Sequence, residues 1–197
     1  MRSPASRPVL DRDGVPESLH NVRNIVGVGS CKGGVGKSTV TVNLAFALAG
    51  LGCNVGILDA DIYGPNLGDL LPDLPHRDPV SGAQIPLVKD AATNHLIPFS
   101  MGRVKSLMSY GFVAPGVTKG ERRAVSVRGP VASQIVNQLI CGTAWGDLDV
   151  LLVDLPPGTG DVPLTLFQQM PFDGNVIVTT PNTLSLADVR MMSTLSL

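Results

Sequence analysis

The sequence predicts an α/β fold with a doubly wound, mostly parallel sheet, and three features of the chain favour it. Four short apolar runs are nearly continuous rather than alternating, as in parallel strands covered on both faces: Asn24–Gly29, Asn54–Asp59, Asp149–Asp154 and Asn175–Thr180. Segments whose apolar residues recur at helical spacing lie between these runs. A glycine-rich loop joins the first run to the first helical segment.

The elements follow one another in a single predicted domain, residues 24–197, after a linker or flexible tail over residues 1–23. Helices are expected in four places: Ser38–Leu51, Pro130–Cys141, and near residues 162–169 and 184–192. The middle of the chain is rich in proline and glycine, and its residues 95–100 and 104–112 are expected to form a hairpin or edge strands. No strand follows the last predicted helix, so we expect a sheet that is incomplete at the C-terminus.

Composition restricts the classes of partner. The 197 residues suffice for one domain with a substantial core. Charged residues make up only 16% of the chain and the formal net charge is -1, which predicts no strong attraction to nucleic acid or to an anionic membrane. The longest apolar region, residues 40–58, is interrupted by asparagines and glycines, so we expect no membrane span. The basic cluster Lys119–Arg128 contains Glu121 and is interpreted as a solvated loop.

The cysteines indicate a reducing, intracellular compartment. They are odd in number and widely spaced, at Cys31, Cys53 and Cys141, which argues against a disulfide framework. The first residues carry arginines but no apolar core after them, unlike a secretory signal. No CxxC motif is present and the three histidines are scattered, so the sequence predicts no metal cluster of the Cys/His type.

The segment CKGGVGKS, Cys31–Ser38, nearly matches the phosphate-binding pattern GxxxxGK[ST], with Cys31 in place of the first glycine. Its glycines let successive N–H groups point at phosphate oxygens, and the positive end of the helix dipole faces the same anion. We therefore expect a P-loop NTPase whose nucleotide is bound by Gly33, Gly34, Val35, Gly36, Lys37, Ser38 and Thr39. Lys37 is expected to reach the β and γ phosphates, and Ser38 to bind Mg²⁺. The alternative is a plain glycine-rich turn between a strand and a helix.

Two aspartates are placed to complete the site, because the carboxyl ends of neighbouring parallel strands meet. Asp154 ends an apolar strand, as a Walker B carboxylate does, and is expected to hold Mg²⁺ directly or through a water. Asp59 and Asp61 follow the second strand, and we expect Asp61 to orient or deprotonate the attacking water. The alternative for Asp61 and Asp154 is a strand-end or helix-capping role. The loop Pro156–Asp161 is expected to move with the state of the γ-phosphate.

The chain then resembles a known group of proteins. KGGVGKST is similar to the deviant Walker A motif of the group that contains septum-positioning and plasmid-partitioning ATPases and the nitrogenase iron protein. Together with LDADIYGPN, RGPV, WGDLDVLLVDLPPGTGDVPLTL and VIVTTP, it resembles the Mrp/ApbC-type iron–sulfur cluster carriers over roughly residues 20–190. The organellar branches are especially similar over VNQLICGTAWGDLDVLLVDLPPGTGD.

The resemblance implies a slow, Mg²⁺-dependent ATPase that forms a nucleotide-bridged homodimer. Such carriers hold a labile [4Fe–4S] cluster and work with apo iron–sulfur proteins or cluster assembly factors. By the same resemblance, Lys32 is a signature lysine that reaches the nucleotide of the partner subunit, as an arginine finger does. Lys37, Ser38 and Thr39 become contacts to phosphate and Mg²⁺, Asp61 the switch I carboxylate, and Asp154 the Walker B residue.

The chain departs from this family in its cysteines. The cluster ligands of these carriers are a CxxC pair beyond the last predicted helix, so we expect no iron–sulfur ligands in this chain and a form truncated before that motif. Cys31, Cys53 and Cys141 are interpreted as structural. The N-terminal residues resemble the linker after an upstream domain in the plastid type, which leaves the compartment open between plastid, mitochondrion and cytosol.

Two other classes of function stay open. A positioning-type ATPase of the same group would need an amphipathic or basic segment at the C-terminus, and residues 186–197 supply one charge pair. A non-catalytic nucleotide-binding remnant would bind a partner without closing a nucleotide site.

Overall fold

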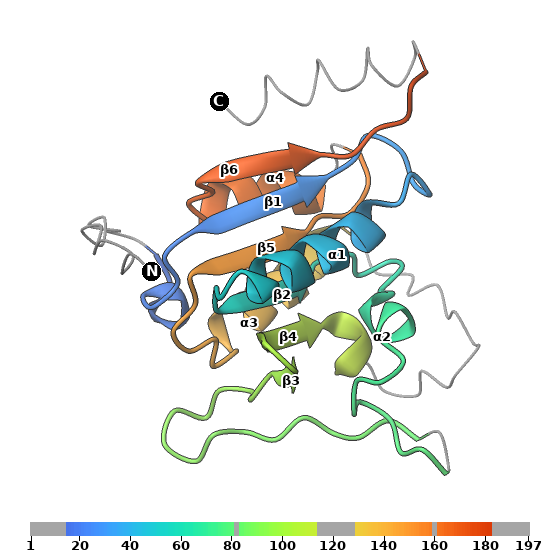
Figure 1. The fold of residues 1–197 in the computed structure, drawn as a ribbon. Helices are drawn as coiled ribbons and strands as arrows, with labels where there is room; N and C mark the ends of the chain where they lie inside the picture. The colour runs from blue at the N-terminus through green and yellow to red at the C-terminus, as the bar shows by residue number, and fades with distance from the viewer. Residues whose placement is uncertain (1–14, 81–82, 114–128, 159–160, 183–197) are drawn as a thin grey trace.

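A six-stranded sheet with the strand order β3-β4-β2-β5-β1-β6 forms the centre of the molecule (Figure 1). This computed structural model describes residues 15–80, 83–113, 129–158 and 161–182. The strands are β1 (Ile25–Gly29), β2 (Val55–Asp59), β3 (Phe99–Met101), β4 (Val104–Ser109), β5 (Val150–Asp154) and β6 (Gly174–Ile177). Neighbouring strands are parallel except for β3 and β4, which pair antiparallel. The predicted α/β, mostly parallel fold is confirmed.

Helices cover both faces of the sheet. They are α1 (Lys37–Gly50), the short α2 (Leu67–Leu70), α3 (Gly129–Cys141) and α4 (Asp161–Gln169), with two 3-10 turns, η1 (Glu17–Leu19) and η2 (Tyr110–Phe112). Alternate residues of β2 and β5 point to opposite faces, because the side-chain period of a strand is two. Ile57 and Leu152 lie in one buried cluster with Ala45 of α1. Leu58 and Leu151 lie in a second cluster with residues of α3 and α4.

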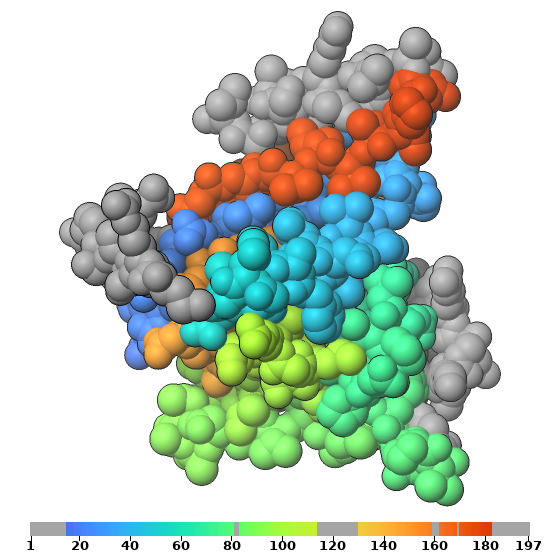
Figure 2. All heavy atoms as spheres, in the orientation of Figure 1, coloured from blue at the N-terminus to red at the C-terminus, as the bar shows by residue number. Residues whose placement is uncertain are grey.

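The surface of α1 faces the viewer in Figure 2, above the yellow-green surface of the β3–β4 hairpin. Val40 on this helix and Leu51 directly after it are exposed, whereas Thr41, Val42, Ala45 and Ala49 are buried. The helix therefore contacts the sheet through one stripe of small and branched residues.

Most of the predicted elements are found within two or three residues of the expected bounds. The predicted hairpin is confirmed by the antiparallel pair β3 and β4. Strand β4, however, lies inside the sheet rather than at its edge, because it pairs with β3 along one side and with β2 along the other. The helix expected near residues 184–192 lies outside the described residues, as does the cluster Lys119–Arg128.

Residues 15–23, which the sequence places in a linker, differ from that prediction. Leu19 and Val22 are buried in the core, and Val22 makes a parallel β-bridge to Leu148, two residues before β5 begins. The three apolar residues of this segment, Val15, Leu19 and Val22, are too short a pattern to be recognised as a core element. Within the described ranges, the structure contains no helix of the length and apolar character that a membrane crossing requires.

Candidate functional site

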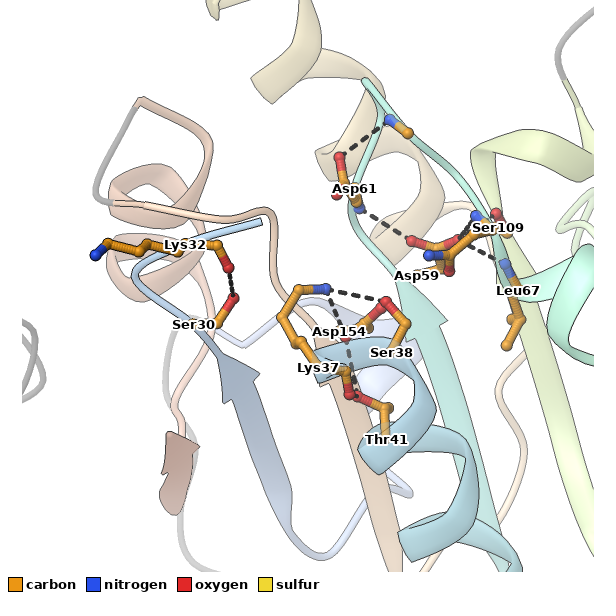
Figure 3. Close-up of polar contacts among 12 residues, drawn as sticks. Ser30, Lys32, Lys37, Ser38, Thr41, Asp59, Asp61, Leu67, Ser109 and Asp154 are labelled. Atoms are coloured by element: carbon orange, nitrogen blue, oxygen red, sulfur yellow. Dashed lines mark hydrogen bonds and ion pairs between the residues drawn. The ribbon is translucent and has the colours of Figure 1, made fainter. Parts of the chain in front are cut away.

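The carboxyl ends of β1, β5 and β2 meet at one edge of the sheet, and the predicted site residues lie there (Figure 3). Val28 of β1 and Asp59 of β2 are the register partners of Asp154 on β5. The loop of residues 30–36 leaves β1 at this edge, and α1 begins directly after it. The arrangement follows from parallel pairing, which places the ends of consecutive strands side by side.

The loop owes its shape to two glycines with left-handed backbone angles. Gly34 has φ 78° and Gly36 has φ 92°, a region that other L-residues rarely adopt. A Cβ atom added at Gly33, Gly34 or Gly36 would meet no heavy atom within 4 Å. Gly34 and Gly36 are therefore required by the backbone rather than by close packing, and open space borders the N-terminus of α1.

Lys37 lies in the first turn of α1 and its side chain turns inward. Its Nζ donates to Oδ1 of Asp154 at 2.7 Å and to Oγ of Ser38 at 3.2 Å. The ion pair is nearly sealed from solvent, with side-chain exposures of 7% for Lys37 and 3% for Asp154. Two other predicted site residues, Ser38 and Asp154, are thus within hydrogen-bonding reach of the Lys37 ammonium group.

Thr41 is a site residue that the sequence analysis did not single out. Its Oγ1 lies 2.9 Å from Oδ1 of Asp154 and 3.1 Å from the carbonyl oxygen of Lys37. A hydroxyl has one proton to donate, and the ionised acceptor forms the stronger hydrogen bond. The signal was present in the sequence, because Thr41 follows Lys37 by four residues and shares its helix face.

Asp61 lies in the loop after β2, half-buried. Its Oδ1 accepts a hydrogen bond from the N–H of Gly64 at 3.2 Å. Burial raises the pKa of Asp61, and the positive charge of Lys37 opposes that shift. The predicted water-orienting residue is therefore within the electrostatic reach of Lys37, although no direct bond joins the two side chains among the contacts of Figure 3.

Asp59 is the other site residue whose role the sequence analysis did not assign. It is 1% exposed, and burial followed by the charge of Asp154 raises its pKa to about 7. Hydrogen bonds from Ser109 and from backbone N–H groups act in the opposite direction. The sequence shows two aspartates at Asp59 and Asp61 but cannot tell which of them turns into the core, because the chain leaves the strand between them.

The remaining predicted residues lie along the loop and the exposed side of α1. Lys32 is exposed and its side chain points away from Lys37 and Asp154 (Figure 3). Its carbonyl oxygen accepts a 2.9 Å hydrogen bond from Oγ of Ser30, which fixes the start of the loop. Val35 is half-buried, and Thr39 is exposed in the first turn of α1.

The loop that follows β5 is tied to the phosphate loop. The N–H of Gly158 donates to the carbonyl oxygen of Ser30 at 2.9 Å, and Gly158 has φ 86°. Residues 159 and 160 lie outside the described residues, so the predicted switch loop Pro156–Asp161 is seen only in part.

The residues at this edge fit a triphosphate and Mg²⁺. The open space beside Gly33, Gly34 and Gly36 borders backbone N–H groups and a helix N-terminus, which is a setting that favours anions. The Ser38 hydroxyl and the Asp154 carboxylate supply the oxygen ligands that Mg²⁺ prefers.

For iron, the part of the chain that the structure describes holds no comparable arrangement. Among the residues that the structure describes, no three His, Cys, Asp or Glu side chains are grouped to hold a metal ion. Cys31, Cys53 and Cys141 are free thiols of intermediate burial.

Comparison with known families gives a match over residues 21–196 to the ParA model described as NUBPL iron-transfer P-loop NTPase. The chloroplastic Fe-S cluster assembly factor HCF101 of rice (Oryza sativa subsp. japonica) is 44% identical over 99% of this chain. The iron-sulfur cluster carrier protein of Synechocystis is 43% identical over 95% of this chain. The chain spans 34% of the rice protein and 48% of the Synechocystis protein.

Solved structures show the same fold. A nucleotide-binding protein from Archaeoglobus fulgidus in complex with ADP has a TM-score of 0.71 and 35% identity, covering 91% of this chain and 63% of its own. The septum site-determining protein MinD from Pyrococcus horikoshii, complexed with Mg-ADP, has a TM-score of 0.50 and 24% identity. That alignment covers 87% of this chain and 65% of MinD, and it supports the fold alone.

Proposed function

Because the chain belongs to the ParA group of P-loop NTPases, in the NUBPL iron-transfer branch, we propose that it binds and slowly hydrolyses Mg-ATP in the service of iron–sulfur cluster transfer. The observation that carries the proposal is the grouping of Lys37, Ser38 and Asp154 beside the glycine loop. A plain strand–helix turn would not bury a lysine and an aspartate together, since burying charges is costly.

Nucleotide binding would use groups that already point at the loop. Backbone N–H groups around Gly33 to Gly36 cradle the phosphates, with the helix dipole of α1 behind them. The Lys37 ammonium then exchanges its bond to Asp154 for bonds to the β and γ phosphates. Ser38 and Asp154 would hold Mg²⁺, which would supply positive charge to neutralise the phosphates.

Hydrolysis would depend on Asp61. A carboxylate with a raised pKa in a half-buried loop is suited to orient the attacking water and to accept its proton. The oxygen of that water attacks the γ-phosphorus, the bond to the bridging oxygen breaks, and ADP and phosphate leave. The role of Lys37 is to stabilise the charge that develops on the phosphate oxygens.

Lys32 would act on the other subunit of a homodimer. It is exposed at the loop and points away from the chain's own Lys37 and Asp154, which agrees with a contact across an interface. A closed two-fold dimer would place each Lys32 against the nucleotide of its partner. The dimer would thereby form only when nucleotide bridges it.

The cargo would be a [4Fe–4S] cluster, passed on to apo iron–sulfur proteins or assembly factors. The rice relative is named an Fe-S cluster assembly factor, and the Synechocystis relative is named an iron-sulfur cluster carrier protein. We propose that Cys31, Cys53 and Cys141 are structural and do not bind the cluster, since they are single thiols in different parts of the fold. A reducing compartment fits these thiols, and the chloroplastic relatives of rice and Arabidopsis thaliana favour a plastid among the three candidate compartments.

The proposal is tested by titrating the chain with Mg-ATP in a calorimeter and by measuring phosphate release. Lys37→Ala is expected to weaken binding by at least about 100-fold, because a charge-assisted phosphate contact is lost. Lys105→Ala removes an exposed lysine on β4 and serves as the matched control with unchanged binding. A wild type that gives no heat with Mg-ATP would indicate the non-catalytic remnant instead. ATP-dependent pelleting with liposomes or DNA would indicate a positioning ATPase.

A further inference from the structure

We infer that Asp59 and Ser109 form a positioning pair that holds Asp61 in place for hydrolysis. This inference rests on the proposed ATPase function and adds two residues to it. Neither Asp59 nor Ser109 belongs to the phosphate loop, and they are 50 positions apart in the chain.

Asp59 holds both ends of the loop that carries Asp61. Its Oδ1 accepts a hydrogen bond from the N–H of Asp61 at 3.1 Å. Its Oδ2 accepts from the N–H groups of Asn66 at 3.2 Å and Leu67 at 3.3 Å. One carboxylate at the end of β2 therefore spans the whole loop of residues 60–67, from its first turn to the start of α2 (Figure 3).

Ser109 fixes that carboxylate from the neighbouring strand. Its Oγ donates to Oδ2 of Asp59 at 2.9 Å, and the two residues are register partners in the parallel pair of β2 and β4. The same Oγ accepts a 3.1 Å hydrogen bond from the N–H of Gly111. The hydroxyl is 1% exposed, so water cannot replace it without a rearrangement.

Asp59 is placed to act through Asp61 rather than on the substrate. Its carboxylate is buried and accepts four hydrogen bonds from protein groups, three of them from backbone N–H groups of residues 61–67. A carboxylate buried beside the second carboxylate of Asp154 is unfavourable for folding alone. Such a cost is typical of residues kept for the geometry of a site.

Ser109→Ala tests the inference, and Ser106→Ala is its matched control. Both serines lie on β4 and are buried, but Oγ of Ser106 donates to the carbonyl oxygen of Trp145 instead, at 2.8 Å. Both variants thus lose a hydrogen bond donated by a buried hydroxyl on the same strand, and Ser109→Ala also loses the bond that its Oγ accepts from the N–H of Gly111. The measurements are the dissociation constant of Mg-ATP and the kcat of phosphate release, made below the melting temperature of each variant.

We expect Ser109→Ala to lower kcat by about tenfold while the dissociation constant stays within about twofold, because a small displacement of a water-orienting group slows chemistry more than binding. Ser106→Ala is expected to leave both quantities unchanged. Asp59→Asn, which presents an amide N–H₂ to some of the same donors, is expected to lower kcat further than Ser109→Ala. If Ser109→Ala keeps the kcat of the wild type, or loses no more than Ser106→Ala, the positioning role is wrong. A wild type that binds Mg-ATP but never hydrolyses it overturns the proposed function, and this role with it.

Discussion

The hydrogen bond from Thr41 to Asp154 yields the sharpest prediction, because the hydroxyl has two acceptors and only one proton. Thr41→Val keeps the shape of a buried side chain and removes only that donor. The carboxylate of Asp154 then keeps Lys37 as its partner at 2.7 Å but loses the bond of 2.9 Å.

The magnitude follows from the charge of the acceptor. Hydrogen bonds to ionised groups contribute about 1.5–3 kcal/mol to stability, against about 1 kcal/mol for neutral ones. Part of the loss is offset, since valine buries no hydroxyl. We expect the free energy of unfolding to fall by about 1.5 kcal/mol, which corresponds to a decrease of about 3–6 °C in Tm for a domain of this size.

A double-mutant cycle measured by urea unfolding checks the acceptor. In the background of Asp154→Asn, Thr41→Val is expected to cost about 1 kcal/mol less than in the wild type, because the charge that strengthens the bond is gone. Thr143→Val is the control, since Oγ1 of Thr143 donates to the carbonyl oxygen of Leu139 and its cost should not depend on Asp154. A coupling energy near zero for Thr41 would refute the reasoning, because the hydroxyl would then donate to the carbonyl of Lys37.

Three further outcomes are expected. Gly36→Ala should lower the free energy of unfolding by about 1–2 kcal/mol through backbone strain alone, since φ is 92° and the added Cβ would contact no neighbouring atom. Gly33→Ala is the control: its added Cβ would also contact no neighbouring atom, and it should lower the free energy of unfolding far less. Lys37→Met should cost about 3–5 kcal/mol in urea unfolding because it leaves Asp154 unpaired, and adding Asp154→Asn should recover part of that loss. The pKa of Asp59 is raised from 3.8 to about 7, so the folded chain binds a proton there more tightly than the unfolded chain, and stability falls as the pH rises through that window by up to about 4 kcal/mol. Asp59→Asn has no carboxyl to titrate at this position. The free energy of unfolding of the wild type should therefore fall relative to that of Asp59→Asn between pH 4 and pH 8. Equal pH profiles for the two proteins would contradict the burial of an ionisable Asp59.

The strands and the phosphate loop could be predicted from the sequence because each depends on local pattern. Nearly continuous apolar runs gave β1, β2 and β5, and the glycines before Lys37 gave the loop. Strand β4 was harder, since its neighbours in the sheet come from distant segments and its place between β3 and β2 depends on pairing rather than on pattern.

The residues of the site likewise divide into those that a local sequence pattern predicts and those that only the tertiary structure reveals. Lys37, Ser38 and Asp154 follow from a motif and a strand end, and the structure brings them together. Asp59 and Thr41 required the tertiary structure, because their partners are Ser109 and Asp154 on other strands. Leu19 and Val22 were placed in a linker for a similar reason, since only the folded chain supplies the surface that buries them.

The most direct test of the whole proposal is phosphate release by an equimolar mixture of Lys32→Ala and Lys37→Ala. Each variant alone is expected to be inactive, since one lacks the lysine for the partner's nucleotide and the other lacks the lysine for its own. In a mixed dimer, one of the two sites combines an intact Lys37 with an intact Lys32. With Mg-ATP at a concentration that also saturates Lys37→Ala, random pairing into two-fold dimers should let the mixture recover about a quarter of the wild-type activity. A mixture as inactive as its components, or a Lys32→Ala variant with full activity alone, would contradict a nucleotide site shared between two subunits.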